Sequence, residues 1–286
     1  FTFINPVLLP AEEYAHKITK TLRGITFDSN YDNGSLLDVI EVGPDIFQTT
    51  LNADPAGSSR PVYWFRFLMT GISGRSITLF LNHRLSPRPV IRMDGAPWRH
   101  MTGMEAPLDD LLTLNFPEGV REAEIAFYFP LGFEETYNAV SDIVRSCDDA
   151  TSFIIGQSFQ GRDLWMVSVT DRRFPDTGKR RVWVHTRVHA GEATSTHVML
   201  GILEAATSPG PLGQHLRRHL IFNIVPQVNA DGIYLGFTRW DSEGRDFERQ
   251  WADPSNTPET KSLWQCAKAF MEGPAPIAVS LNLHST

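Results

Sequence analysis

The stretch RRVWVHTRVHAGE, residues 180–192, determines how the second half of the chain is expected to fold. Its β-branched residues alternate along the chain and predict a strand, and an apolar-periodic segment at 197–206 predicts a helix after it. A strand that ends where a helix begins marks the carboxyl edge of an α/β sheet, where ligands and catalytic groups collect. His189 and Glu192 lie at this junction and are therefore candidate functional residues.

These two residues together offer an imidazole nitrogen and a carboxylate oxygen. Zn²⁺ binds both kinds of ligand, and a catalytic zinc takes three protein ligands and a water molecule. The last predicted strand, residues 277–283, ends at His284, which offers a third ligand. A His-x-x-Glu pair alone is common by chance, so the alternative is that both histidines cap strands and Glu192 favours the helix dipole. From these residues alone, both interpretations stay open.

Length and composition narrow the class of protein. A chain of 286 residues favours two domains, and a formal net charge of −7 argues against binding to a nucleic-acid backbone. No run of eighteen apolar residues is present, so we expect no membrane span. With only Cys147 and Cys266 and no visible signal peptide, the sequence predicts a cytoplasmic protein. No oligomeric state can be predicted from these features.

The first domain is expected to comprise residues 1–131. Short alternating segments separated by turn residues predict an antiparallel β-sandwich without catalytic residues. Its predicted strands lie at residues 25–27, 45–51, 62–68, 76–81 and 122–129.

The second domain is expected to comprise residues 132–286. Strands that alternate with helices predict an α/β/α domain with a mixed, largely parallel sheet that is incomplete at its C-terminal end. Besides the elements above, we expect a helix at 134–145, a hairpin at 153–169, a buried strand at 220–226 and a helix at 258–271.

A second motif makes the functional interpretation of the sequence more specific. Residues 226–232 read Pro-Gln-Val-Asn-Ala-Asp-Gly, and two arginines, Arg239 and Arg249, follow them. Taken together, these features resemble the zinc metallocarboxypeptidase superfamily, most closely its cytosolic carboxypeptidase subgroup. The shared features are a β-sandwich ahead of the catalytic domain, an Arg-x-His-x-Gly-Glu turn at 187–192, an Asn-x-Asp-Gly loop with a downstream Arg, and a strand ending in Leu-His-Ser at 283–285. Residues 63–67 and 156–162 extend the similarity over most of the chain.

The resemblance implies roles for individual residues. His189, Glu192 and His284 would hold one zinc ion per chain, and Arg239 would polarise the scissile carbonyl and stabilise the oxyanion. Arg249 would bind the terminal carboxylate of the substrate, because an arginine fork suits a carboxylate. The implied activity is hydrolysis of a C-terminal peptide or amide bond by a zinc-activated water, with a peptide or protein tail as substrate. Without the resemblance, both arginines would be read as surface residues.

Two substitutions depart from the family pattern. Glu248 occupies the substrate-binding position before Arg249, where the family has an Asn that donates to the substrate carboxylate. A carboxylate there would repel the substrate's carboxylate unless protonated or turned away, and could favour an amine-bearing group. Ala190 replaces a Pro that preorganises the family's zinc-binding turn, which is a modest change.

The third departure is at the end of the chain. The family's general base, a Glu, lies beyond the position that corresponds to Thr286, so no residue here can be assigned that role. We expect the sequence to be part of a longer protein, because domains do not normally end inside a core layer. Two alternatives stay open. Residues 282–286 are similar to aspartoacylase-like relatives, which suggests a zinc deacylase of N-acyl amino acids. The missing base and Glu248 suggest a non-catalytic peptide-tail binding protein with a residual metal site.

Overall fold

The computed structural model describes residues 17–51, 63–81, 88–108 and 110–285. These residues form two compact units. One unit comprises residues 131–233 and 239–285, and the other comprises the described residues up to Pro130. Residues 234–238 come from the second half of the sequence but pack with this other unit, where Tyr234 O accepts a hydrogen bond from the backbone N–H of Asn33.

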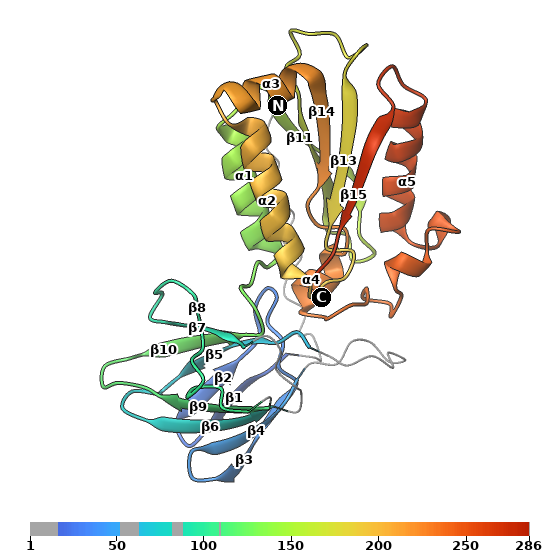
Figure 1. Ribbon diagram of the computed structural model, residues 1–286. Coiled ribbons are helices and arrows are strands. Elements are labelled where there is room, and N and C mark those ends of the chain that lie inside the picture. Colours follow the sequence, from blue (N-terminus) through green and yellow to red (C-terminus); the bar gives the residue numbers. More distant parts are fainter. Residues whose placement is uncertain (1–16, 52–62, 82–87, 109, 286) are drawn as a thin grey trace. The chain divides into compact units, whose positions relative to one another are not determined.

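The N-terminal unit is a β-sandwich of two sheets, which confirms the predicted class (Figure 1). One sheet has the order β1-β2-β5-β10-β7-β8, and the other has the order β3-β4-β6-β9. Neighbouring strands are antiparallel except for β4 and β6, which run parallel. The bounds are β1 Thr19–Leu22, β2 Ile25–Asp28, β3 Asp38–Gly43, β4 Ile46–Thr50, β5 Arg66–Thr70, β6 Ser76–Leu81, β7 Val90–Met93, β8 Arg99–His100, β9 Leu111–Asn115 and β10 Glu122–Ala126.

The sandwich core lies between the two sheets, and several strands bury alternate residues in it. On β6, for example, Ile77 and Leu79 are buried while Phe80 between Leu79 and Leu81 is exposed. Phe27 of β2 and Phe47 of β4 meet edge to face across the sandwich, with ring centroids 5.1 Å apart. Such a pair adds to the stability gained from burying the two rings, and it connects the sheets.

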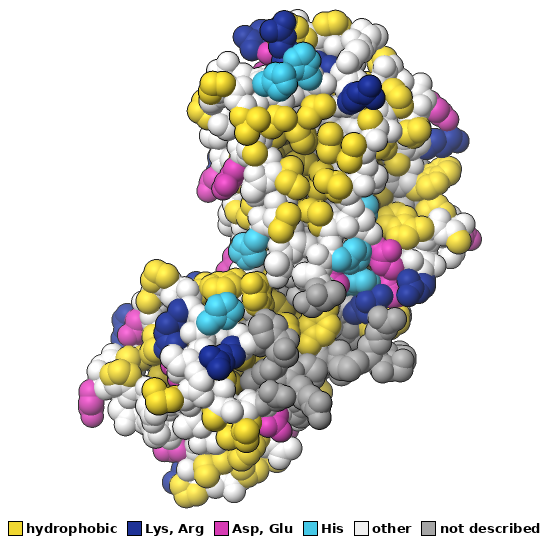
Figure 2. Space-filling view, viewed as in Figure 1, with side chains coloured by type: hydrophobic (Ala, Val, Ile, Leu, Met, Phe, Trp, Pro, Cys, Tyr) yellow, Lys and Arg dark blue, Asp and Glu magenta, His cyan; other side chains and the backbone are white. Residues whose placement is uncertain are grey.

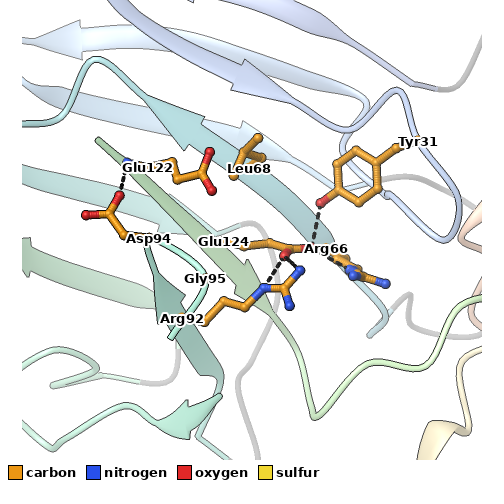
Figure 3. Close-up of a pocket in the computed structure, with 8 residues that line it drawn as sticks. All are labelled: Tyr31, Arg66, Leu68, Arg92, Asp94, Gly95, Glu122 and Glu124. Carbon is orange, nitrogen blue, oxygen red and sulfur yellow. Dashed lines mark hydrogen bonds and ion pairs between the residues drawn. The ribbon is translucent and has the colours of Figure 1, made fainter. Parts of the chain in front are cut away.

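A buried carboxylate ties together three strands of the larger sheet (Figure 3). Glu124 of β10 accepts hydrogen bonds from Nε of Arg66 on β5 and Nε of Arg92 on β7, each at 2.6 Å. The hydroxyl of Tyr31 lies 3.2 Å from the same carboxylate. Burial, followed by the charge of Glu124, holds the pKa of Tyr31 well above its usual range. These residues line a cavity of about 320 Å³.

The second unit is built on one five-stranded sheet with the order β11-β12-β14-β13-β15. Strands β14, β13 and β15 run parallel, whereas β11 and β12 form the predicted hairpin and are antiparallel to their neighbours. The sheet is therefore mixed, as predicted. The bounds are β11 Ala150–Gln157, β12 Asp163–Val169, β13 Arg180–Thr186, β14 Leu220–Val225 and β15 Ile277–Leu283.

Helices cover both faces of this sheet, with α1 and α2 on one face and α5 on the other (Figure 1). Helix α5 begins after Thr257, whose hydroxyl accepts a hydrogen bond from the backbone N–H of Thr260, and Pro258 fills its first position. The bounds are α1 Phe133–Arg145, α2 Ala193–Thr207, α3 Pro211–His219, α4 Ala230–Leu235, α5 Pro258–Met271, and two 3₁₀ turns, η1 Phe247–Arg249 and η2 Pro254–Asn256. No helix in the described ranges has both the length and the apolar character that crossing a membrane requires.

Strand β15 forms one edge of the sheet and is exposed along most of its length. Val279 and Leu281 are exposed to 47% and 36%. Figure 2 shows hydrophobic side chains gathered on this face between α2 and α5. An edge strand with exposed apolar side chains is a template for pairing with a further strand.

Candidate metal centre

The turn after β13 is fixed by a buried arginine. Arg187 has a positive φ of 57° and is fully buried. Its guanidinium donates hydrogen bonds of 2.8 Å to the carbonyl oxygens of Ala190 and Leu131. The chain therefore reverses tightly at this point. As a result, Nδ1 of His189 lies 2.8 Å from Oε1 of Glu192.

The parallel pairing of β13 and β15 brings the third residue to the same place. The register pairs Thr186 with Leu283, so that His284 follows directly beside the turn. Nδ1 of His284 lies 2.8 Å from Oε2 of Glu192. One potential ligand atom from each of His189, Glu192 and His284 lies within 4.8 Å of the others. The structure therefore brings together three residues that span 95 positions in the sequence.

The donor set and its exposure fit a catalytic zinc ion. Both imidazoles direct Nδ1 toward the Glu192 carboxylate, and two imidazoles with one carboxylate form a ligand set of catalytic zinc sites. His189 and Glu192 are almost completely buried, whereas the side chain of His284 is 31% exposed. The cluster is thus reachable from solvent on the His284 side. Their role as zinc ligands stays a prediction.

Asp246, which the sequence analysis did not identify, links the cluster to Arg239. Its Oδ1 lies 3.3 Å from Nε2 of His189, and its Oδ2 accepts a 2.9 Å hydrogen bond from Nε of Arg239. Burial alone would raise the pKa of Asp246, but the hydrogen bonds from His189 and Arg239 outweigh it and lower the pKa well below its usual range. Asp246 also caps η1, since it accepts from the backbone N–H of Glu248. An Asp directly before a short helical turn is a typical N-cap, and this was the sequence signal that could have identified Asp246.

Arg239 and Glu248 both lie at the cluster. Nη1 of Arg239 is 3.5 Å from Nδ1 of His189, so that a positive charge adjoins the potential ligand atoms. Oε1 of Glu248 lies 3.1 Å from Nε2 of His284. Arg249 is exposed on η1, and its side chain makes no hydrogen bond or ion pair with other residues in the described ranges. The substrate-binding roles of Glu248 and Arg249 stay predictions.

The Asn-Ala-Asp-Gly motif at 229–232 is a scaffold for this region. The side-chain amide of Asn229 donates to the carbonyl oxygen of Trp240 at 3.0 Å, and its oxygen accepts from the backbone N–H of Gly232 at 3.0 Å. A Cβ atom at Gly232 would lie 2.6 Å from both Asn229 Oδ1 and Trp240 O, so only glycine fits there. The motif therefore fixes the segment that carries Arg239.

Asp231 of the same motif organises the loop between β11 and β12. It is fully buried and accepts hydrogen bonds from the hydroxyl of Ser158 at 2.6 Å and from Nη1 of Arg162 at 2.7 Å. It also accepts from the backbone N–H of Gln160 at 2.8 Å. Two sequence motifs that are far apart, 156–162 and 226–232, thus meet at one carboxylate.

A neighbouring glutamate, Glu259, is buried close to two other acidic residues. Glu259 on α5 accepts a 2.9 Å hydrogen bond from the backbone N–H of Phe159, but its Oε2 has no hydrogen-bond partner among the described residues. Burial, with the charges of Asp231 and Asp241, raises the pKa of Glu259 from its ordinary 4.5 to about 7. In the folded protein this carboxyl is therefore mostly protonated below about pH 7.

We expect Glu259→Gln to stabilise the protein at pH 8 and to have little effect at pH 4.5. Because the folded pKa of Glu259 lies above the unfolded one, the stability that its protonated form contributes is lost as the pH rises from 4.5 through 7. A shift of this size corresponds to about 3 kcal/mol, and glutamine does not undergo the loss. Thermal unfolding at the two pH values measures the difference. Glu272→Gln, at an exposed position after α5, is the control. Equal effects of the two substitutions at pH 8 would contradict the assignment.

Comparison with known proteins identifies the class to which this fold and cluster belong. Residues 136–286, more than half of the chain, match the family model of the zinc carboxypeptidases, peptidase family M14. The chain therefore belongs to the zinc carboxypeptidase family.

Within that family, the chain is similar to cytosolic carboxypeptidases. It is 27% identical over 254 residues to cytosolic carboxypeptidase 6 of Mus musculus, an alignment that covers 81% of this chain and 47% of the relative. The chain thus spans about half the length of this relative. Two solved metallo-carboxypeptidases share its fold. The metallo-carboxypeptidase of Burkholderia cenocepacia superposes with a TM-score of 0.75 at 20% identity, and the match covers 92% of this chain and 71% of the other. The metallo-carboxypeptidase of Pseudomonas aeruginosa superposes with a TM-score of 0.74 at 22% identity, and the match covers 91% of this chain and 69% of the other.

Proposed function

We propose that this chain forms the zinc-binding part of a metallocarboxypeptidase that hydrolyses a C-terminal peptide or amide bond. The observation that carries the proposal is the convergence of His189, Glu192 and His284, with the guanidinium of Arg239 beside them. Membership of the zinc carboxypeptidase family supports it. The names of the cytosolic relatives support a cytoplasmic location as part of the same proposal.

The chemistry follows from the neighbours of the cluster. A bound zinc ion supplies a Lewis acid and lowers the pKa of a water ligand toward ~7. Arg239 then donates hydrogen bonds to the substrate carbonyl oxygen, on which negative charge develops, and Asp246 holds the guanidinium of Arg239 in place. Arg249 is exposed and free to pair with a terminal carboxylate of a peptide tail. No described residue is assigned as the general base.

Steady-state assays with peptides that have a free C-terminus, and with N-acyl amino acids, test this proposal. We expect a full-length protein that contains this chain to release C-terminal residues, with the activity lost in His284→Ala and kept in His215→Ala, a control at an exposed histidine of α3. Turnover of N-acyl amino acids alone would favour the deacylase alternative, which is motivated by residues 282–286. Zinc-dependent binding of a peptide tail without turnover would favour the binding protein.

A further inference from the structure

We propose that Glu248 is a positioning residue for the metal centre: it orients His284 by accepting a hydrogen bond from its outer ring nitrogen. The inference rests on the proposed zinc site and adds a residue to it. Glu248 lies on η1 and is not one of the three potential ligands, and its carboxylate faces His284.

The two nitrogens of His284 are used on opposite sides of the ring. Nδ1 lies 2.8 Å from Glu192 and is the atom directed into the ligand cluster. Nε2 lies 3.1 Å from Oε1 of Glu248. An imidazole that binds a metal through Nδ1 carries its proton on Nε2, and an acceptor at Nε2 fixes both this tautomer and the ring orientation. Glu248 is placed to be that acceptor.

The carboxylate of Glu248 is itself held in position. Its Oε1 accepts a 2.7 Å hydrogen bond from the side-chain amide of Asn282, two residues before His284 on β15. Its backbone N–H donates to Asp246 at 3.0 Å. Because the amide and the imidazole that contact Glu248 come from the same strand end, the carboxylate connects η1 to the end of β15.

The same 3₁₀ turn serves both histidines. Asp246, the cap of η1, lies against Nε2 of His189, and Glu248, two residues later, lies against Nε2 of His284. Each imidazole therefore has its own outer carboxylate, and both carboxylates come from one short segment. This arrangement gives Glu248 a role that does not require it to bind the substrate's carboxylate.

Zinc affinity, measured by competition with a chromogenic chelator, tests the inference without reference to activity. We expect Glu248→Ala to weaken zinc binding by about 10- to 100-fold, the usual cost of losing an outer-shell partner. Glu248→Gln keeps an oxygen that can accept from Nε2 but removes the charge, so we expect an affinity between those of the unsubstituted chain and the alanine variant. Glu243→Gln, at an exposed glutamate of the preceding loop, should bind zinc with unchanged affinity.

A second readout separates orientation from simple charge. In the zinc-loaded protein, the ¹⁵N chemical shifts of His284 should report a protonated Nε2, and Glu248→Ala should change the shift of that nitrogen. Unchanged zinc affinity in Glu248→Ala, or equal losses in the alanine and glutamine variants, would overturn the inference and leave the proposed function standing. Failure of the unsubstituted chain to bind zinc would overturn both.

Discussion

Replacing Glu124 by alanine is expected to lower the free energy of unfolding of the sandwich by about 3–5 kcal/mol, because it removes one partner of a buried ion pair. The side chain of Arg66 is only 4% exposed and pairs with Glu124 at 2.6 Å. Arg92 and the hydroxyl of Tyr31 lose their contact with the same carboxylate. Removing one side chain therefore affects three strands of one sheet.

Hydrogen exchange of the amides in β5 and β10 measures this change, because it reports the opening of the sandwich separately from the other unit. Glu122→Ala is the matched control, since Glu122 lies on the same strand and lines the same cavity but is partly exposed. We expect the control to change stability by no more than about 0.5 kcal/mol. A loss below about 1 kcal/mol in Glu124→Ala would show that the network does not stabilise the fold.

Replacing Asp246 by alanine is expected to weaken zinc binding by about 10- to 100-fold. It also removes the contacts that Asp246 makes with Arg239, the proposed oxyanion donor, and we expect kcat to fall by about 10²- to 10³-fold as a result. Both effects arise because one carboxylate contacts Nε2 of His189 and both Nε and Nη2 of Arg239.

Zinc competition and peptide hydrolysis measure the two effects of Asp246→Ala. The control is Asp253→Ala, because Asp253 caps η2 in the same way that Asp246 caps η1 but is exposed, and its carboxylate accepts hydrogen bonds from Ser255 of η2. Parallel losses in both variants would mean that capping of the 3₁₀ turns, and not the contacts of Asp246 at the cluster, is responsible.

Local pattern was sufficient to predict much of the second unit. Three elements could be predicted because each has a clear pattern of apolar residues. These are the alternation at 180–186, the continuous apolar run at 220–225 and the helical spacing at 258–271, which correspond to β13, β14 and α5. The turn at His189 and the strand that ends at His284 were found for the same reason. Their meeting depends on the parallel pairing of β13 with β15, which was not predicted from the sequence.

Other features depend on contacts that no local pattern reveals. Helix α3 was not predicted, because its nine residues carry few apolar side chains and only Gly213 and Arg217 are buried. Strands β1, β3, β7, β8 and β9 were also missed, and β5 begins at Arg66 although a strand was expected from position 62, which lies outside the described residues. Asp246 was overlooked because its partners, His189 and Arg239, lie 57 and 7 positions away.

Metal content by elemental analysis, on the unsubstituted chain and on His284→Ala, tests the central claim most directly. We predict about one zinc ion per chain in the first protein and loss of zinc in the second, because His284 is one of only three potential ligands that converge within the described residues. Zinc absent from the unsubstituted chain, or retained in full by His284→Ala, would contradict the proposed metal centre.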